Sequence, residues 1–347
     1  MNDCGKDKAR DEYPFVSIVV IGYNEADNLD KTFTAIKSMN YPMHRIEVIY
    51  VDSGSSDDSL SIARNYTDKC FLEDRYPSAG RNRNRGLMEA KHDIVHFIDG
   101  DMAIDKDYLR RVVSIFEEKH VQAVTGLHIE VGKGPLNKIN RLADSGLSRK
   151  EGFTIFTSTG ATYKKHALLS INGYDERIIR GQESEMGFRF INAGYKIWCT
   201  EITMGFHTDG FGNVYSFLKR SSLTGKSLFQ LSKLDGDNAY FDRAKRASKR
   251  QIIRTAVLSL SFIVSLVFSL TKYFMLVYTI YIIYSNRSVY RKENPASIVL
   301  IKVLLKPFMN VFMQYGYYQE AIKYHLGISD KGFYSLNKES LSPKSFK

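Results

Sequence analysis

Two carboxylates separated by one glycine, Asp99 and Asp101, stand at the end of the largely apolar run Ile94–Ile98. Such a run is typical of a buried strand, and open α/β sheets bind their ligands at the carboxyl ends of their strands. Two oxygen-bearing side chains on one short turn suit a hard divalent cation and, through it, a diphosphate. Asp-Gly-Asp is also common in ordinary turns, so the surrounding sequence must decide between these interpretations.

Two further apolar runs end in polar loops in the same way. Phe15–Ile21 is followed by Gly22-Tyr23-Asn24-Glu25, and Ile46–Val51 is followed by Asp52-Ser53-Gly54. Apolar residues at helical spacing come after each loop, so strand, polar loop and helix repeat three times. This repeat predicts an α/β fold with a doubly wound, mainly parallel sheet and helices on both faces. The three polar loops then line one crevice.

The crevice lacks the glycine-rich loops that commonly bind phosphates. No GxGxxG follows the first predicted strand, and no GxxxxGK[ST] occurs in the chain. An ordinary dinucleotide-binding fold and a P-loop are therefore disfavoured. An acidic crevice without such a cradle must bind a diphosphate through a metal ion instead.

Three other segments carry candidate functional groups. Ser78–Gly86 holds three arginines at alternating positions, either on a solvated turn or as forks that meet phosphate or the face of a base. A predicted helix carries Glu183 and Glu185 at its N-terminal end, where the helix dipole favours carboxylates even without a function. His207 follows a predicted short strand, Tyr195–Cys199, and is placed in a loop between two glycines.

The net charge of +11 is unevenly distributed. Residues 1–210 carry a net charge of −3 and residues 211–347 carry +14. The basic segment Arg243–Arg250 directly precedes the apolar run 252–285, and Val299–Tyr318 is a second apolar candidate. Basic residues beside apolar runs indicate an anionic membrane surface rather than a nucleic acid. We therefore expect a membrane-associated helical region, with a helical subdomain that caps the catalytic part as the alternative.

Cysteine usage and composition narrow the class of protein. Cys4, Cys70 and Cys199 are widely separated and form no CxxC pair, so neither a disulfide framework nor a zinc site is expected, and a reducing cytosolic setting fits best. The polar stretch 1–13 lacks the apolar core of a secretory signal. Hydrophobic residues at 44% and charged residues at 25% are ordinary globular values, which excludes a disordered or fibrous protein.

Taken in order, these motifs resemble family 2 of the inverting glycosyltransferases with the GT-A fold, over about residues 15–210. The resemblance rests on Tyr23-Asn24-Glu25, Asp52–Asp57, Arg83–Gly86, Phe97–Asp101, Gly173–Glu176, Gly181–Glu183 and His207. It implies a GT-A nucleotide-diphospho-sugar transferase domain followed by C-terminal apolar helices. The expected domains are a polar N-terminal tail (1–13), the catalytic domain (14–215), a basic juxtamembrane segment (216–250), a membrane-associated helical region (251–318) and a polar C-terminal tail (319–347).

The resemblance also implies a role for each matching residue. The nucleotide sugar would be bound by Tyr23, Asn24, Glu25, Asp52, Ser53, Arg83, Asp99 and Gly100. Asp101 would ligate Mg²⁺ or Mn²⁺, and His207 would complete the metal shell or contact the diphosphate. The family's acidic pair corresponds to Gln182-Glu183, so Glu183 inherits the role of catalytic base. Glu185 is the alternative base, and Gly160 and Gln182 are candidate acceptor or helper positions.

The expected activity is the transfer of a sugar from a nucleotide-diphosphate donor to an acceptor hydroxyl by a single inverting displacement. The resemblance favours a bacterial enzyme of surface polysaccharide biosynthesis that acts on a glycan or lipid-linked acceptor. The apolar run and the basic C-terminal segment favour a location at the cytoplasmic face of the cell membrane. One alternative is a glycosyltransferase that acts on a soluble acceptor, with the C-terminal helices as a lid or an oligomer contact. Another is a non-catalytic sugar-nucleotide binding protein.

Overall fold

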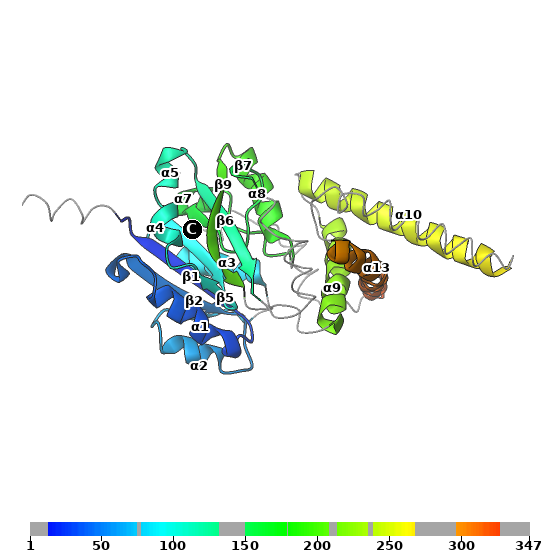
Figure 1. The fold of residues 1–347 in the computed structure, drawn as a ribbon, viewed down its shortest axis with the longest axis horizontal. Helices are drawn as coiled ribbons and strands as arrows, with labels where there is room; N and C mark the ends of the chain where they lie inside the picture. The colour runs from blue at the N-terminus through cyan, green and yellow to red at the C-terminus, as the bar shows by residue number, and fades with distance from the viewer. Residues whose placement is uncertain are drawn as a thin grey trace, which may run out of the picture. The chain divides into compact units, whose positions relative to one another are not determined.

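The computed structural model describes residues 13–74, 78–131, 150–178, 180–207, 214–234, 239–267 and 296–326 (Figure 1). The described residues fall into two compact units, one that ends at residue 207 and one that begins at residue 214. This division lies close to residue 215, the predicted end of the catalytic domain.

A sheet of nine strands, counted over the described residues, forms the centre of the first unit. The strands are β1 (Val16–Gly22), β2 (Ile46–Asp52), β3 (Cys70–Leu72), β4 (Ile94–Asp99), β5 (Met102–Ile104), β6 (Ala123–Glu130), β7 (Gly152–Thr154), β8 (Thr162–Lys164) and β9 (Ile197–His207). Their order is β3-β2-β1-β4-β8-β6-β9-β5, and β7 pairs with β9 outside this path. The three predicted strands β1, β2 and β4 are parallel neighbours, and their polar loops therefore meet at one edge.

The prediction of a mainly parallel sheet is wrong for the second half, because the sheet is mixed. Strand β8 is antiparallel to β4 and β6, and β9 is antiparallel to β5 and β7 while it runs parallel to β6. Strands β5, β7 and β8 are three residues long. A segment of that length is too short to show the period by which a strand is recognised in a sequence.

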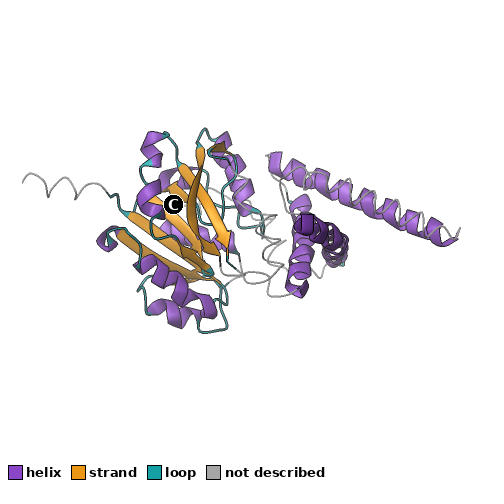
Figure 2. Ribbon diagram, in the orientation of Figure 1, coloured by secondary structure: helices purple, strands orange, loops and turns teal. Residues whose placement is uncertain are grey.

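Helices cover both faces of the sheet, as predicted (Figure 2). They are α1 (Ala26–Lys37), α2 (Ser59–Arg64), α3 (Ala79–Glu89), α4 (Tyr108–Val112), α5 (Ile115–Glu118), α7 (Lys165–Ser170) and α8 (Gln182–Asn192), with the 3₁₀ turn η1 (Met43–Arg45). Every residue of β1 is buried. Val16, Ile18 and Val20 pack with α1, α2, α4 and α5, whereas Val19 and Ile21 pack with α3, α7 and α8. Alternation of side chains along one strand thus builds two cores.

Helix α3 lies close against β1. A Cβ atom on Gly86 would lie 2.1 Å from Cγ1 of Val19, so only a glycine permits this approach. The segment Ser78–Gly86, for which a solvated turn is one of the two interpretations offered above, is mostly buried helix. Its arginines therefore project from a rigid element.

The second unit consists of three helices over its described residues, α9 (Val214–Lys233), α10 (Ala239–Val267) and α13 (Ala296–His325). Helices α9 and α13 cross closely, since a Cβ on Gly225 would lie 1.8 Å from the carbonyl oxygen of Met313. Glu320 is buried between them, where it accepts a hydrogen bond from Gln230 at 3.1 Å and lies 3.5 Å from the ammonium of Lys226. The predicted polar tail from residue 319 thus begins inside a packed helix.

The expected C-terminal apolar helices are not supported. Helices do form at both places, but none in the described part of the chain is long and apolar enough to cross a membrane. The first half of α10 is rich in Lys and Arg, and α13 carries Lys302, Lys306 and Glu320 along its length. Positions 268–285 of the predicted apolar run lie outside the described residues.

Candidate active site

The carboxyl ends of β1, β2 and β4 form one edge with fixed geometry. The pairing places Gly22 beside Asp52, and Ile21 beside Asp99. The amide of Ser53 donates to the carbonyl of Gly22 at 3.0 Å, and the amide of Gly100 donates to the carbonyl of Ile21 at 2.8 Å. The three polar loops are therefore held together by backbone hydrogen bonds before any ligand binds.

The loop after β1 is fastened to the loop after β2. Asn24 has a left-handed backbone (φ 56°), and its Oδ1 accepts a hydrogen bond from the amide of Ser56 at 2.8 Å. The amide of Glu25 donates to Ser59 at 2.8 Å, and a Cβ on Gly100 would lie 3.0 Å from the Glu25 side chain. Glu25 and Gly100 are thus close neighbours.

Tyr23 and Asp52 differ in their access to solvent. Tyr23 is 48% exposed at the end of β1 and can offer a ring to a base. Asp52 is 1% exposed. Its carboxylate accepts hydrogen bonds from the amide and hydroxyl of Ser55, at 2.6 and 2.7 Å, and from the hydroxyl of Tyr50 at 2.8 Å. With these contacts Asp52 holds the conformation of the loop after β2. The hydroxyl of the neighbouring Ser53 accepts a hydrogen bond from the side-chain amide of Asn82 at 2.7 Å.

Asp101 and His207 are brought together across the sheet. The prediction that His207 lies in a loop is wrong. Strand β9 extends through this residue, and its pairing with β5 places Met102 beside His207. His207 Nε2 lies 3.2 Å from Asp101 Oδ2. No group of three or more His, Cys, Asp or Glu side chains placed to hold a metal occurs among the described residues. A carboxylate and an imidazole still fit Mg²⁺ or Mn²⁺, since such ions at phosphate-transfer sites take few protein ligands and complete their shell with phosphate and water.

The arginines of α3 all pair with carboxylates. Arg81 lies 3.1 Å from Glu73, and Arg85 lies 2.9 Å from Glu89. Arg83 is 1% exposed, so its side chain is fully buried. Its guanidinium lies 2.8 Å from Asp99 and 3.0 Å from Glu183. The prediction that Arg83 contacts the nucleoside therefore does not fit its burial.

Within this ion-pair cluster the pKa values of Arg83 and Asp99 are shifted. Burial alone would lower the pKa of the Arg83 guanidinium, but Asp99 and Glu183 together raise it above its usual range. Burial raises the pKa of Asp99; Arg83 opposes that shift, while Asp101 and Glu183 add to it. A carboxylate with a perturbed pKa beside a buried cation at the end of a strand is characteristic of functional sites.

The two candidate bases on helix α8 differ in burial and in ion-pair partners. Glu183 lies in its first turn, with its side chain 16% exposed. Glu185 is 1% exposed, and both of its oxygens are held by Arg189 at 2.7 Å. Glu185 is therefore a structural ion-pair partner and not an available base. Gln182 is buried and donates to the carbonyl of Ile178 at 2.7 Å.

Gly160, a candidate acceptor position, has a packing role. A Cβ at this residue would lie 2.9 Å from the terminal methyl of Met204. The residue therefore permits a close contact inside the sheet region.

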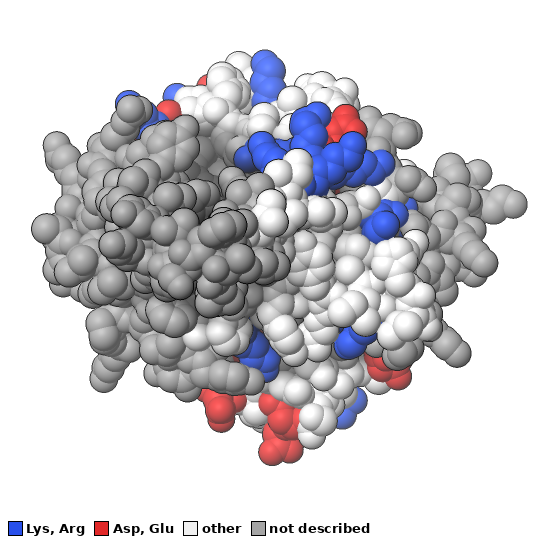
Figure 3. Space-filling view, turned by 90° about the vertical axis from the view of Figure 1, so that its right-hand side faces the viewer, with Lys and Arg blue, Asp and Glu red and all other residues white. Residues whose placement is uncertain are grey.

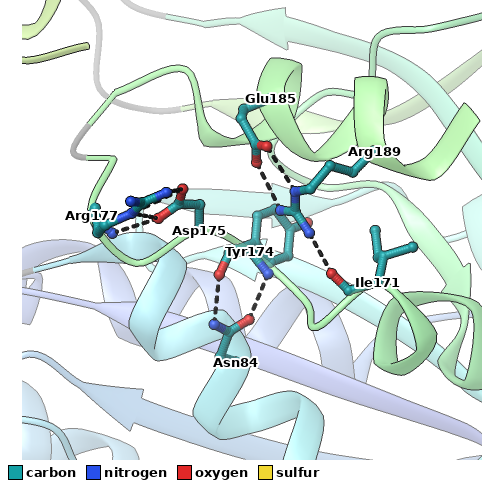
Figure 4. A network of polar contacts seen from close by, with 7 residues as sticks. All are labelled: Asn84, Ile171, Tyr174, Asp175, Arg177, Glu185 and Arg189. Carbon is teal, nitrogen blue, oxygen red and sulfur yellow. Dashed lines mark hydrogen bonds and ion pairs between the residues drawn. The ribbon is translucent and has the colours of Figure 1, made fainter. Parts of the chain in front are cut away.

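Asn84 is a site-supporting residue that the sequence reasoning missed (Figure 4). Its amide donates to the carbonyl of Tyr174 and accepts from the amide of Tyr174, both at 2.8 Å. On the same network, Arg189 bridges Glu185 to the carbonyl of Ile171. Together these contacts fix the segment that leads into α8. The only signal in the sequence was the match of Arg83–Gly86 to the family motif.

Residues 17–172 match the family model described as glycosyl transferase family 2. Over these residues the chain is similar to that family. The glycosyltransferase AglE of Haloferax volcanii is 26% identical over 240 residues, which cover 64% of this chain and 75% of AglE. The O-antigen chain rhamnosyltransferase WbaN of Salmonella anatum is 29% identical over 211 residues, which cover 55% of this chain and 65% of WbaN. The succinoglycan biosynthesis protein ExoA of Rhizobium meliloti is 26% identical over 201 residues, which cover 54% of this chain and 61% of ExoA.

The GT-A-like fold of this chain has a solved counterpart. The mannosyltransferase PcManGT from Pyrobaculum calidifontis, solved in complex with GDP-Man and Mn²⁺, is similar with a TM-score of 0.54. The match covers 90% of this chain and 87% of PcManGT at 19% identity. The likeness at that identity is one of fold, so the substrates and metal of this chain must be argued from its own residues.

Proposed function

We propose that this chain is an inverting, metal-dependent glycosyltransferase that moves a sugar from a nucleotide-diphosphate donor to an acceptor hydroxyl. The observation that carries the proposal is that Glu183 and Asp99 both contact Arg83. Asp101, two residues after Asp99, lies beside His207. A base, a donor-side carboxylate and a metal-ligand pair thus gather where the family 2 domain presents its strand ends.

The donor fits the edge formed by β1, β2 and β4. Exposed Tyr23 can stack on the base, and the joined loops that carry Asn24, Glu25 and Asp52 bound the nucleoside side of the crevice. The diphosphate would lie toward Asp101. A divalent cation bound there by Asp101 and His207 would neutralise the charge that develops on the leaving diphosphate.

The transfer requires a base because an acceptor hydroxyl attacks poorly while it keeps its proton. Glu183 takes that proton as the acceptor oxygen forms its bond to the anomeric carbon. The bond from that carbon to the diphosphate oxygen breaks, and the nucleoside diphosphate leaves with the electron pair. One displacement inverts the anomeric centre. Such a base contributes about 10²- to 10⁴-fold in rate.

A polysaccharide acceptor is supported by the relatives. WbaN is named for O-antigen chain synthesis and ExoA for succinoglycan biosynthesis. We extend this class of acceptor to the present chain and place it on a lipid carrier at the cytoplasmic face of the membrane.

Helix α10 supplies the physical argument for the membrane. Phe241, Ala244, Ser248 and Gln251 are buried along one face of the helix. The opposite face exposes Arg243, Arg246, Lys249 and Arg250, followed by Ile252 and Ile253. Figure 3 shows Lys and Arg side chains gathered on one part of the molecular surface. A basic face beside exposed isoleucines suits the anionic interface of a bilayer, where each cation contributes about 1 kcal/mol.

The reaction is tested with a panel of UDP-glucose, UDP-N-acetylglucosamine, GDP-mannose and dTDP-rhamnose, each with Mn²⁺ or Mg²⁺. We expect one donor to raise the melting temperature and to release its nucleoside diphosphate slowly. Glu183→Gln should keep donor affinity and lower the release rate by about 10²-fold or more. Donor binding without turnover under all conditions would instead identify a non-catalytic binding protein.

Membrane binding is tested by flotation of the full chain with vesicles of phosphatidylglycerol and phosphatidylcholine. We expect binding that falls with salt and is lost when Arg243, Arg246, Lys249 and Arg250 of α10 become glutamine. The control replaces exposed Lys31, Arg64, Lys91 and Lys106 of the first unit and should still float. Equal binding to neutral vesicles would refute the role of the basic residues, and no binding at all would favour the soluble-acceptor alternative.

A further inference from the structure

The guanidinium of Arg83 joins the two halves of the candidate active site. Nη2 lies 2.8 Å from Asp99 Oδ1 at the end of β4. Nη1 lies 3.0 Å from Glu183 Oε1 and 3.2 Å from Gln182 Oε1 in the first turn of α8. The side chain is 1% exposed and is the largest of the fully buried side chains in the described part of the molecule. A residue enclosed in this way acts through its neighbours rather than on a substrate.

We infer that Arg83 is a positioning residue that holds the base Glu183 in register with the donor-side Asp99, an inference that rests on the proposed transfer reaction. The two carboxylates come from separate elements, and the planar fork of an arginine spans both at hydrogen-bond distance. A lysine ammonium would lie near one or the other, but it could not hold both in a fixed orientation.

The packing of helix α3 and the contact with Tyr174 fix the orientation of the Arg83 guanidinium. Helix α3 is pressed onto β1 at Gly86, and Asn84 fixes the adjoining loop through the backbone of Tyr174. The Tyr174 ring also faces the guanidinium, with its centroid 5.5 Å from Cζ. Arg83 is thus held by the fold on both sides, so the carboxylates orient to it.

Gln182 fits this arrangement. Its neutral side-chain oxygen accepts a hydrogen bond from Nη1 of Arg83, and its side-chain NH₂ group donates to the carbonyl of Ile178. An acidic side chain at this position would put a third carboxylate on one guanidinium and would compete with Glu183. The glutamine therefore leaves the cation to Asp99 and Glu183.

The contact between Arg83 and Glu183 also gives the two carboxylate oxygens of Glu183 different roles. Arg83 engages Oε1 of Glu183, and the carboxylate is 16% exposed. Oε2 is therefore the oxygen that meets the acceptor proton. A shift of the carboxylate by about 1 Å would cost about 10²-fold in rate, since proton transfer depends on alignment.

A double-mutant cycle tests the inference with Arg83→Lys, Glu183→Gln and the double variant. The probe is whichever nucleotide sugar of the panel above gives the largest thermal shift with Mn²⁺, and the readouts are nucleoside diphosphate release and calorimetric donor affinity. Arg83→Lys should lower kcat by about 10- to 100-fold while the donor Kd changes by less than about 3-fold. In the Glu183→Gln background the same substitution should change kcat by less than about 3-fold, because the group it positions is absent.

Two further variants keep the test decisive. Arg81→Lys is the matched control, a buried arginine on the same helix whose partners are Glu73 and Glu176, and it should keep kcat within about 3-fold. If Arg83→Lys does not fold, Gln182→Met removes one anchor of the fork without stranding a charge. It should lower kcat by about 3- to 10-fold and have no effect in the Glu183→Gln background.

The outcomes separate this inference from the proposed function. Full multiplication of the Arg83→Lys and Glu183→Gln losses would overturn the positioning role. So would a tenfold weaker donor Kd with kcat retained, which would make Arg83 a donor-binding residue. Undiminished release by Glu183→Gln alone would instead refute the base assignment on which the proposed function depends.

Discussion

Replacement of Asn84 by alanine tests how strongly helix α3 holds the segment that leads to the base. The amide of Asn84 makes two 2.8 Å hydrogen bonds with the backbone of Tyr174 and donates a third to Glu176 at 3.1 Å. Asn84 and Tyr174 are both buried, so water cannot replace the amide. The backbone N–H and C=O of Tyr174 would be left without their partner.

The expected loss follows from those contacts. The two backbone groups of Tyr174 left unsatisfied cost about 1–3 kcal/mol each, or about 2–6 kcal/mol together. For a domain of this size that corresponds to a fall in Tm of about 4–24 °C. Because the Tyr174 segment leads to Gln182 and Glu183, we also expect kcat to fall more than donor affinity.

Asn84→Asp is the informative companion. A carboxylate can still accept from the amide of Tyr174, but it offers no donor to the carbonyl and faces the carboxylate of Glu176. We therefore expect it to be at least as destabilising as alanine. Asn65→Ala, at an exposed position after α2, serves as control and should leave Tm unchanged. Thermal melting followed by circular dichroism decides the matter: a shift of less than about 2 °C for Asn84→Ala, or a stable Asn84→Asp, would refute the reasoning.

Three further predictions follow from the same structure. Gly86→Ala should destabilise the first unit by about 1–3 kcal/mol in urea denaturation, because the new methyl overlaps Val19; an unchanged midpoint would show that α3 can move. Burial lowers the pKa of His96 from 6.5 to about 3, so between these values the unfolded chain holds a proton that the folded chain lacks. Stability should therefore fall as the pH drops from about 6.5 to about 3, by up to about 1.4 kcal/mol per unit, and His96→Asn should flatten that slope. Asp101→Asn should abolish the stabilisation that Mn²⁺ and nucleoside diphosphate give together in a thermal melt; full retention would remove Asp101 from the metal site.

The sequence by itself determined the elements that have strong local signals. The continuous apolar runs of β1, β2 and β4 fixed three parallel strands, and the polar residues after them had to meet at one edge. Asp99, Asp101, Glu183 and His207 could be proposed because each lies in a short motif. The predicted helices on both faces followed from the same repeat.

The tertiary structure decided which polar residues can reach a substrate. Arg81, Arg83 and Arg85 look alike in sequence, yet the fold pairs each with a carboxylate and buries Arg83 completely. Two residues apart on α8, Glu183 keeps its side chain 16% exposed, whereas Glu185 is turned inward onto Arg189. Burial and ion pairing depend on elements distant in sequence, so no local pattern contains them.

The same limit explains the antiparallel half of the sheet and the place of His207. Strands β5, β7 and β8 are set by partners far along the chain rather than by their own three residues. Pairing of β5 with β9 brings His207 to Asp101, which are 106 positions apart in the sequence. Short-range sequence patterns therefore identify the chemical groups, and long-range packing brings them together into a site.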